Sequence, residues 1–305
     1  MRRSVFFLLL SASLVTSSAL WAQVPKPNPS APPPPPTAAP AVHPAEKCAN
    51  PDAIPMSRTV EIDTTGAPGF GFEHFKNHDF LKKGEVVLTF DDGPWIGNTP
   101  AVLKALADNC IKATFFIIGK HATYYPDILK EVAAADHTIG AHTWSHANLG
   151  KKTFEQAKEE IEKGISAIQW ALDGQPSAPF FRFPYLKHPP EVVKYLAERN
   201  VAIFSTDLDS FDFRMHKPEQ VIKSVMAKLE KHGKGIILMH DFQHATAQAL
   251  PELLKQMKEK GYKIVHMRPK FMIKSLPEYD AMLQKEMKLP AANRAPTDSI
   301  VKTVE

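Results

Sequence analysis

The stretch Val86-Val87-Leu88-Thr89-Phe90-Asp91-Asp92-Gly93-Pro94 decides the fold that we expect. It begins as an apolar run rich in β-branched residues, which is typical of a strand buried on both faces of a parallel sheet. The run ends in two adjacent carboxylates and a Gly-Pro break that stops the strand. Two neighbouring acids repel each other unless a cation or a proton separates them. The same pattern also fits an ordinary loop whose aspartates cap the next helix, so the rest of the chain must decide.

Strand-like and helix-like segments alternate along the chain after this strand. Such alternation predicts a parallel α/β sheet with right-handed crossovers. About seven strands fit a distorted (β/α) barrel, whereas an open doubly wound sheet is the alternative, weakened by the lack of a Gly-rich dinucleotide loop. The predicted strands are Glu85–Phe90, Ala113–Ile118, Thr138–Ala141, Phe180–Phe183, Val201–Ser205, Gly235–Met239 and Lys263–His266. The predicted helices are Thr99–Asn109, Tyr125–Ala135, Phe154–Leu172, Pro190–Asn200, Pro218–Lys231 and Ala247–Lys260.

The ends of the chain differ from this alternating region. Arg2 and Arg3 precede an apolar stretch from Val5 to about Ala19, so we expect residues 1–22 to be a secretory signal, cleaved after Ala19 or Ala22. An uncleaved membrane anchor is the alternative, although the apolar run is short for a spanning helix. We expect the mature protein to be periplasmic or secreted, without stable membrane insertion.

Composition and domain boundaries follow the same division. We expect residues 23–47 to be a Pro-rich linker, 48–83 an irregular N-terminal extension and 84–270 the main α/β domain. Residues 271–305 are expected to be a C-terminal tail, mobile from Leu289 onward. Ten of the 27 prolines lie between Pro25 and Pro44, which favours an extended spacer. The net charge of +4 is spread without a basic stripe, so we expect no nucleic-acid partner.

Cys48 and Cys110 are the two cysteines of the chain. In an exported protein an even pair indicates a disulfide, which here would tie the start of the globular region to the domain. Two buried thiols are the alternative.

Ionisable side chains gather at the predicted carboxyl ends of the strands. The third strand is followed by His142 and His146, whose spacing would put both rings on one side of a helical turn. Together with a carboxylate from Asp91 or Asp92 they make a two-His-one-carboxylate metal site with open positions. The remaining carboxylate, kept ionised by the cation, is then a candidate general base. Taken alone, a His-x-x-x-His pair is often structural.

The other strand ends supply candidate partners for this chemistry. His240 follows the sixth strand, and strand order places it across the barrel mouth; a histidine there suits a general acid. Asp212 is our candidate for orienting His240, by the logic of catalytic triads. Arg182 is expected to hold one of the carboxylates through a bidentate contact. We interpret Asp207 and Asp209 as solvated or capping groups, and His121 as structural.

These stretches, in this order, resemble the polysaccharide deacetylases of carbohydrate esterase family four, over roughly Glu85 to Met267. The resemblance implies a distorted (β/α) barrel and a single divalent metal, usually zinc, with cobalt, nickel and manganese as alternatives. It implies that Asp92, His142 and His146 hold the metal.

The resemblance also implies the remaining roles. Asp91 would be the base, oriented by Arg182, and His240 the acid, tuned by Asp212. The backbone N–H of Tyr185 would stabilise the oxyanion and Leu238 would line the pocket for the acetyl methyl group. Phe213, where the family more commonly has Trp, and Leu186, where Gly is usual, depart from the family pattern and alter the groove wall.

The implied activity is removal of N-acetyl groups from N-acetylglucosamine units of an acetylated glycan, either chitooligosaccharide or peptidoglycan. An O-acetyl esterase acting on an acetylated polysaccharide and a non-catalytic carbohydrate-binding module are the alternatives. The sequence predicts neither the glycan nor the oligomeric state.

Overall fold

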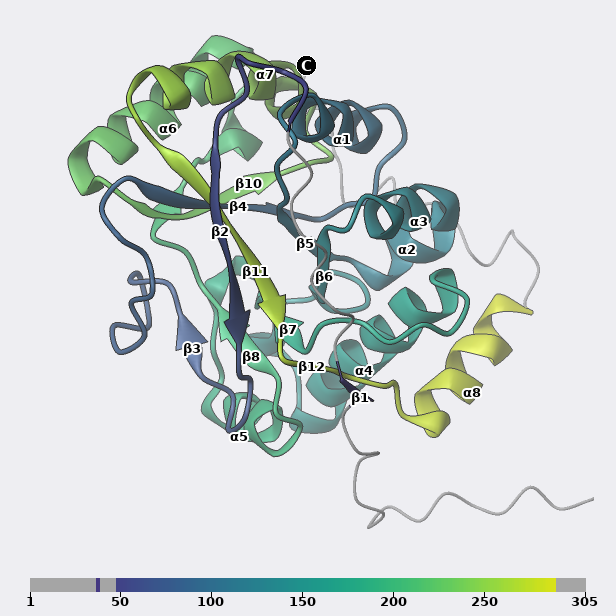
Figure 1. The fold of residues 1–305 in the computed structure, drawn as a ribbon. Coiled ribbons are helices and arrows are strands. Elements are labelled where there is room, and N and C mark those ends of the chain that lie inside the picture. Colours follow the sequence, from purple (N-terminus) through teal and green to yellow (C-terminus); the bar gives the residue numbers. More distant parts are fainter. Residues whose placement is uncertain (1–36, 39–47, 289–305) are drawn as a thin grey trace, which may run out of the picture. The chain divides into compact units, whose positions relative to one another are not determined.

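The computed structural model describes residues 37–38 and 48–288, which form a parallel α/β sheet flanked by helices (Figure 1). The predicted signal peptide, most of the Pro-rich linker and the residues from Leu289 onward lie outside this described part. Within it, no helix combines the length and the apolar character needed to cross a membrane.

One half of the sheet follows the chain order. The strand that carries the two carboxylates is buried along its whole length. From it, parallel strands add one by one along a single edge, so their carboxyl ends meet on one side of the sheet. These strands are β4 (Glu85–Asp91), β5 (Thr114–Ile117), β6 (Thr138–Ala141), β7 (Phe180–Phe181) and β8 (Ala202–Phe204).

The other edge of β4 does not follow the chain order. β10 (Gly235–His240) pairs with β4 in parallel, and His240 lies in register with Asp91. β9 (Leu208–Asp209) continues beyond β10, and no pairing joins β8 to β9 among the described strands, so the hydrogen-bonded ring stays open. The expectation that His240 lies across the barrel mouth from the first strand was therefore wrong. It lies beside Asp91 because β10 inserts directly next to β4.

Helices pack on the outside of these strands and bury their apolar sides (Figure 1). The long helix α4 begins with a capping box in which Thr153 and Gln156 satisfy each other's backbone N–H groups. The short helix α2 was not predicted. The helices are α1 (Asn98–Asp108), α2 (Gly119–Tyr124), α3 (Pro126–Ala134), α4 (Phe154–Ala171), α5 (Pro190–Glu198), α6 (Pro218–His232), α7 (His244–Glu259) and α8 (Pro277–Met287).

The segment 48–83, predicted to be irregular, contains two strands. β2 (Met56–Ile62) pairs in parallel with β11 (Lys263–Pro269), and β3 (Gly69–Phe70) pairs with β8. β2 was missed because it is an edge strand with mostly half-exposed side chains, so it lacks a continuous apolar run.

An ion pair ties β2 to the start of β4. The guanidinium of Arg58 donates to both carboxylate oxygens of Glu85, at 2.9 and 2.7 Å. Ser57 and the N–H of Lys82 donate to the same carboxylate. The Arg58 contact, acting against burial, lowers the pKa of Glu85 to about 2.

The region from Phe271 onward, predicted to be a tail, also carries structure. β12 (Phe271–Met272) pairs with β1 (Thr37–Ala38), and α8 packs against α4 through Leu283, which is buried with Trp144 and Ala167. Only Tyr279 and Leu283 of α8 are buried, and the apolar residues Ala281 and Met282 beside Leu283 are exposed, so the apolar residues do not form one stripe. The sequence pattern therefore did not reveal this helix.

Cys48 and Cys110 form the predicted disulfide, with Cα atoms 5.6 Å apart and a sequence separation of 62. The bridge ties the segment before β2 to the residues that follow α1.

Replacement of Glu85 by Gln tests the link between β2 and β4. Because the folded-state pKa lies below the usual value, the ionised carboxylate stabilises the protein above about pH 4.5, and this stabilisation is lost as the pH falls towards 2. We expect Glu85→Gln to lower the free energy of unfolding by on the order of 1–2 kcal/mol at pH 7, with the difference shrinking as the pH falls from 5 to 2. Urea denaturation across this pH range measures it.

Glu61→Gln, on the exposed side of β2, is the matched control and should leave the free energy of unfolding nearly unchanged. A deficit for Glu85→Gln that stays constant down to pH 2 would contradict the assignment.

Candidate metal centre and active site

The two carboxylates at the end of β4 differ in burial and in backbone conformation. Asp91 is the last strand residue and is buried, with 2% of its surface exposed. Asp92 has φ 73°, a left-handed conformation that turns the chain out of the strand, and its N–H donates to the carbonyl of Phe116. Both carboxylates nevertheless approach the same imidazole, since Asp91 Oδ2 lies 3.9 Å and Asp92 Oδ1 3.5 Å from His142 Nε2.

Asp92, His142 and His146 form a cluster of potential metal ligands. Asp92 Oδ1 lies 3.5 Å from His142 Nε2 and 3.6 Å from His146 Nε2. The two histidines are separated by a turn, with Thr143 at φ 68° and His146 at φ 57°, and not by the helical turn that the spacing predicted. The left-handed residues nevertheless bring the two rings to a centroid distance of 5.0 Å.

This donor set fits a divalent cation. Ligands about 2.1 Å from a tetrahedral zinc ion lie about 3.4 Å from one another, close to the separations between these atoms. Asp92 Oδ1 is buried and has no hydrogen-bond partner among the described residues. A buried carboxylate oxygen needs a partner, and a cation bound between Asp92, His142 and His146 would be that partner. His142 Nδ1 donates to the carbonyl oxygen of Arg182 at 2.6 Å, which leaves the Nε2 lone pair facing Asp92.

Two residues behind this turn position it. His121 Nδ1 donates to the carbonyl oxygen of Asp92 at 2.5 Å from a buried site in α2. The carboxylate of Asp241 packs so closely on Gly93 that a Cβ there would lie 2.2 Å from Asp241 Oδ2, which explains why glycine follows the two acids. Thr99 donates to the same carboxylate at 2.5 Å. Asp241 was not singled out from the sequence, because only the strand pairing reveals its place behind Gly93.

Arg182 lies fully buried beside Asp91 and connects both halves of the site. Its Nη1 donates to Asp91 Oδ1 and to Thr89 Oγ1, both at 2.7 Å, and its Nη2 donates to the carbonyl of Ser205 at 2.8 Å. The predicted bidentate contact was wrong, because Nη2 is used by Ser205. The guanidinium also lies 4.3 Å from the ring centre of Phe116.

His240 lies on the other side of Asp91, paired with the buried Asp212. Its Nδ1 is 2.6 Å from Asp212 Oδ1, and its backbone N–H and the hydroxyl of Thr246 donate to Asp212 Oδ2. Burial alone lowers the pKa of His240, but the Asp212 carboxylate more than offsets this and the net effect raises the pKa. The free Nε2 faces the metal cluster, 3.9 Å from Asp92 Oδ2.

The remaining candidate residues border this cluster. Tyr185 has φ 58°, and its exposed ring contacts His146 edge-on at 4.9 Å. Leu238 lies two residues before His240 on β10, hence on the same face of the strand, and is buried. Asp207 and Asp209 accept hydrogen bonds from backbone N–H groups, as expected of capping residues.

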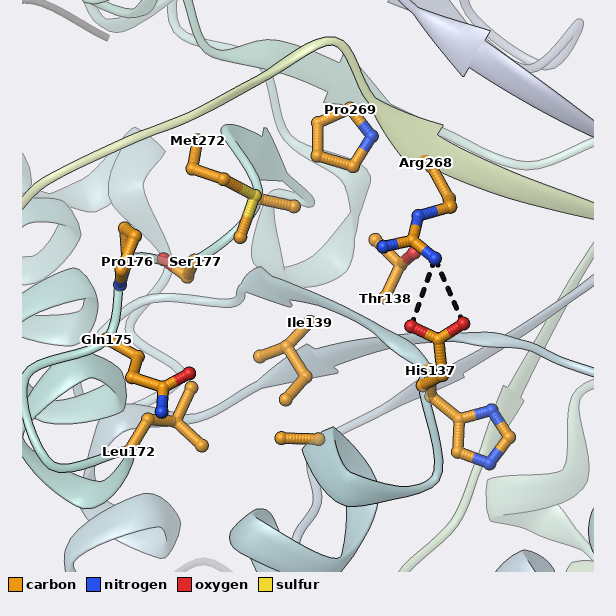
Figure 2. A pocket seen from close by; sticks show the side chains of 13 residues that line it. His137, Thr138, Ile139, Leu172, Gln175, Pro176, Ser177, Arg268, Pro269 and Met272 are labelled. Atoms are coloured by element: carbon orange, nitrogen blue, oxygen red, sulfur yellow. Dashed lines mark hydrogen bonds and ion pairs between the residues drawn. The ribbon is translucent and has the colours of Figure 1, made fainter. Parts of the chain in front are cut away.

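A separate cavity of about 140 Å³ lies at the opposite ends of the strands, next to Thr138 at the start of β6 (Figure 2). Its charged wall consists of Arg268, which donates to both oxygens of Asp136 at 3.0 and 2.9 Å. No candidate residue of the metal cluster lines this cavity. We therefore do not assign the chemistry to it.

Comparisons with known proteins agree with this site. The family model described as polysaccharide deacetylase matches residues 79–203. A peptidoglycan-N-acetylglucosamine deacetylase of Bacillus cereus is 32% identical over 187 residues, covering 60% of this chain and 66% of that protein. A chitooligosaccharide deacetylase of Azorhizobium caulinodans is 32% identical over 162 residues, covering 52% of this chain and 74% of that protein.

A solved structure has the same fold. The Bdellovibrio bacteriovorus peptidoglycan deacetylase Bd3279 superposes with a TM-score of 0.65 and 32% identity, covering 77% of this chain and 63% of that one. The match thus spans slightly less than two thirds of the length of the Bacillus and Bdellovibrio relatives.

Loss of one imidazole tests the metal centre. We expect His142→Ala to weaken zinc binding at least a hundredfold, because it removes one of the three proposed ligands. The carbonyl oxygen of Arg182 already orients this imidazole towards the site. Isothermal titration calorimetry of the metal-stripped protein measures the affinity.

His216→Ala, an exposed histidine outside the cluster, is the control and should bind zinc like the wild type. Equal affinity of the His142→Ala and wild-type proteins would show that the cation binds elsewhere.

Proposed function

Because the chain belongs to the polysaccharide deacetylase family, we propose that it is a metal-dependent hydrolase that removes N-acetyl groups from N-acetylglucosamine units of a glycan. The single observation that carries this proposal is the placement of Asp91 and His240 against one potential metal cluster. Asp91 Oδ2 lies 3.9 Å from His142 Nε2, and His240 Nε2 lies 3.9 Å from Asp92 Oδ2. Each of them is held by a buried partner of its own, Arg182 and Asp212 respectively. A hydrolase needs such a base and such an acid around one reacting carbonyl.

Asp92, His142 and His146 would hold the cation. When bound, a divalent cation polarises a carbonyl oxygen and makes water more acidic. In this setting Asp91 accepts the proton of the attacking water through Oδ2, because Oδ1 is engaged by Arg182. The Arg182 contact also fixes the direction of the Asp91 carboxylate.

His240 supplies the proton for the departing amine. Its Nδ1 is engaged by Asp212, so the proton is carried on Nε2, which faces the cluster. The raised pKa keeps the imidazole protonated until the carbon–nitrogen bond breaks. The N–H of Tyr185 would donate to the developing oxyanion, and Leu238 would contact the acetyl methyl group.

Chitooligosaccharide and peptidoglycan both present the required acetamide, and the names of the relatives include both. An O-acetyl esterase would use the same base, cation and proton carrier, because an alkoxide leaving group also accepts a proton. Substrate profiling therefore separates the two activities. A non-catalytic binding module is the less favoured alternative, since every proposed proton carrier is present. The Cys48–Cys110 disulfide supports an exported, periplasmic or secreted protein.

Replacement of the proposed base separates metal binding from catalysis. We expect Asp91→Asn to bind zinc nearly as well as the wild type but to lower kcat at least a hundredfold, because the amide cannot accept the proton. Acetate release from chitin oligomers and from peptidoglycan fragments, with and without a chelator, measures the rate.

Asp136→Asn, at the far ends of the strands, makes the same chemical change without touching the site, and should retain full activity. Near-wild-type acetate release by Asp91→Asn would refute the role of Asp91. Acetate release from acetylated xylan, with none from chitin oligomers or peptidoglycan fragments, would favour the O-acetyl esterase.

A further inference from the structure

Exposed aromatic side chains extend outward from the proposed acid. The ring of Phe213 meets the imidazole of His240 edge-on, with centroids 5.6 Å apart, and Phe211 lies next to it at 6.1 Å. Phe213 is 45% exposed and Phe211 is 39% exposed, although both are large apolar groups. An apolar surface left open beside a reacting centre is a candidate for ligand contact.

The backbone holds Phe211 in this exposed position at a steric cost. Phe211 has φ 56°, in the left-handed region that aromatic residues rarely adopt. The carboxylate of Asp209 accepts the N–H of Phe211 at 2.8 Å, and the carbonyl of Phe211 accepts the N–H of Arg214. The local hydrogen bonds therefore retain a conformation that keeps the ring out of the core.

The guanidinium of Arg214 lies over both rings. Its central carbon is 5.2 Å from the centre of Phe213 and 5.4 Å from that of Phe211. Arg214 forms no ion pair with another described side chain, and arginine stays charged at any relevant pH. Lys228 approaches Phe211 as well, 4.7 Å from the ring centre. The Arg214 guanidinium is thus held by the two rings and remains available to bind an anion. Only the ring of Phe213 separates it from His240.

We propose that Phe211, Phe213 and Arg214 form a subsite for a carboxylate-bearing sugar unit adjacent to the acetylated unit, so that the enzyme prefers an acidic glycan to a neutral one. This inference rests on the proposed deacetylase function and narrows its substrate class. The aromatic faces contact the apolar face of the sugar, while the guanidinium binds the carboxylate through two parallel hydrogen bonds. A neutral glycan gains only the stacking contact.

The carboxylate has two possible sources on a peptidoglycan strand, the lactyl ether of the muramic acid unit and the attached peptide. Soluble fragments with the peptide and fragments from which an amidase has removed it separate the two. Chitin oligomers of equal length serve as the neutral substrate.

Substitution of Arg214 tests the subsite. We expect Arg214→Gln to raise KM for the carboxylate-bearing fragments about three- to fivefold with kcat nearly unchanged, the upper part of the range for an exposed charged pair. Its kcat/KM on chitin oligomers should remain within about twofold of the wild-type value. Arg214→Lys, which keeps the charge but loses the planar fork, should show an intermediate KM.

Lys223→Gln on α6 removes the same charge from an exposed position without an aromatic contact, and should leave both substrates unaffected. Equal effects of Arg214→Gln on acidic and neutral glycans, or no effect on either, would overturn the proposal. If the wild type releases no acetate at all, the proposed function fails instead. Co-sedimentation with insoluble peptidoglycan and with chitin then still measures whether Arg214 favours the acidic polymer.

Discussion

Two adjacent carboxylates at the end of a buried strand impose the constraint on which the site depends. Each negative charge taken out of water needs a positive partner. Asp91 has one within the chain, the fully buried guanidinium of Arg182 at 2.7 Å. Asp92 has none of comparable strength, since Oδ1 is buried without a hydrogen-bond partner and faces two imidazole nitrogens. The same requirement thus produces both a carboxylate fixed in direction by Arg182, the proposed base, and a potential cation site next to it.

Parallel strands and left-handed turns bring the members of the site together. β4, β6 and β10 end on one side of the sheet, so Asp92, His142 and His240 meet there despite their separation in sequence. Arg182 joins two of these parts, because its side chain holds Asp91 while its carbonyl orients His142. Among the described residues, five of the eleven non-glycine residues with positive φ lie in or next to this cluster, namely Asp92, Thr143, His146, Tyr185 and Phe211.

Buried strands and their terminal residues could be predicted from the sequence, because a parallel sheet leaves long apolar runs and gathers polar groups at one edge. β2 could not, since its edge position leaves half-exposed side chains. α8 could not either, because its apolar residues are spread over a buried and an exposed side. The place of His240 next to Asp91 depends on the insertion of β10 beside β4, which strand order along the chain does not specify. For the same reason the contacts of His121 and Asp241 behind the metal turn gave no sequence signal.

The most direct test of the central claim is the position of the cation itself. Crystals of the full chain grown with zinc, measured on both sides of the zinc absorption edge, locate the metal by its anomalous scattering. Our account predicts one strong peak between the Asp92 carboxylate and the Nε2 atoms of His142 and His146, with Asp91 held by Arg182 outside the ligand set. A zinc peak coordinated by other residues, or no peak at this cluster in metal-loaded and active protein, would contradict it.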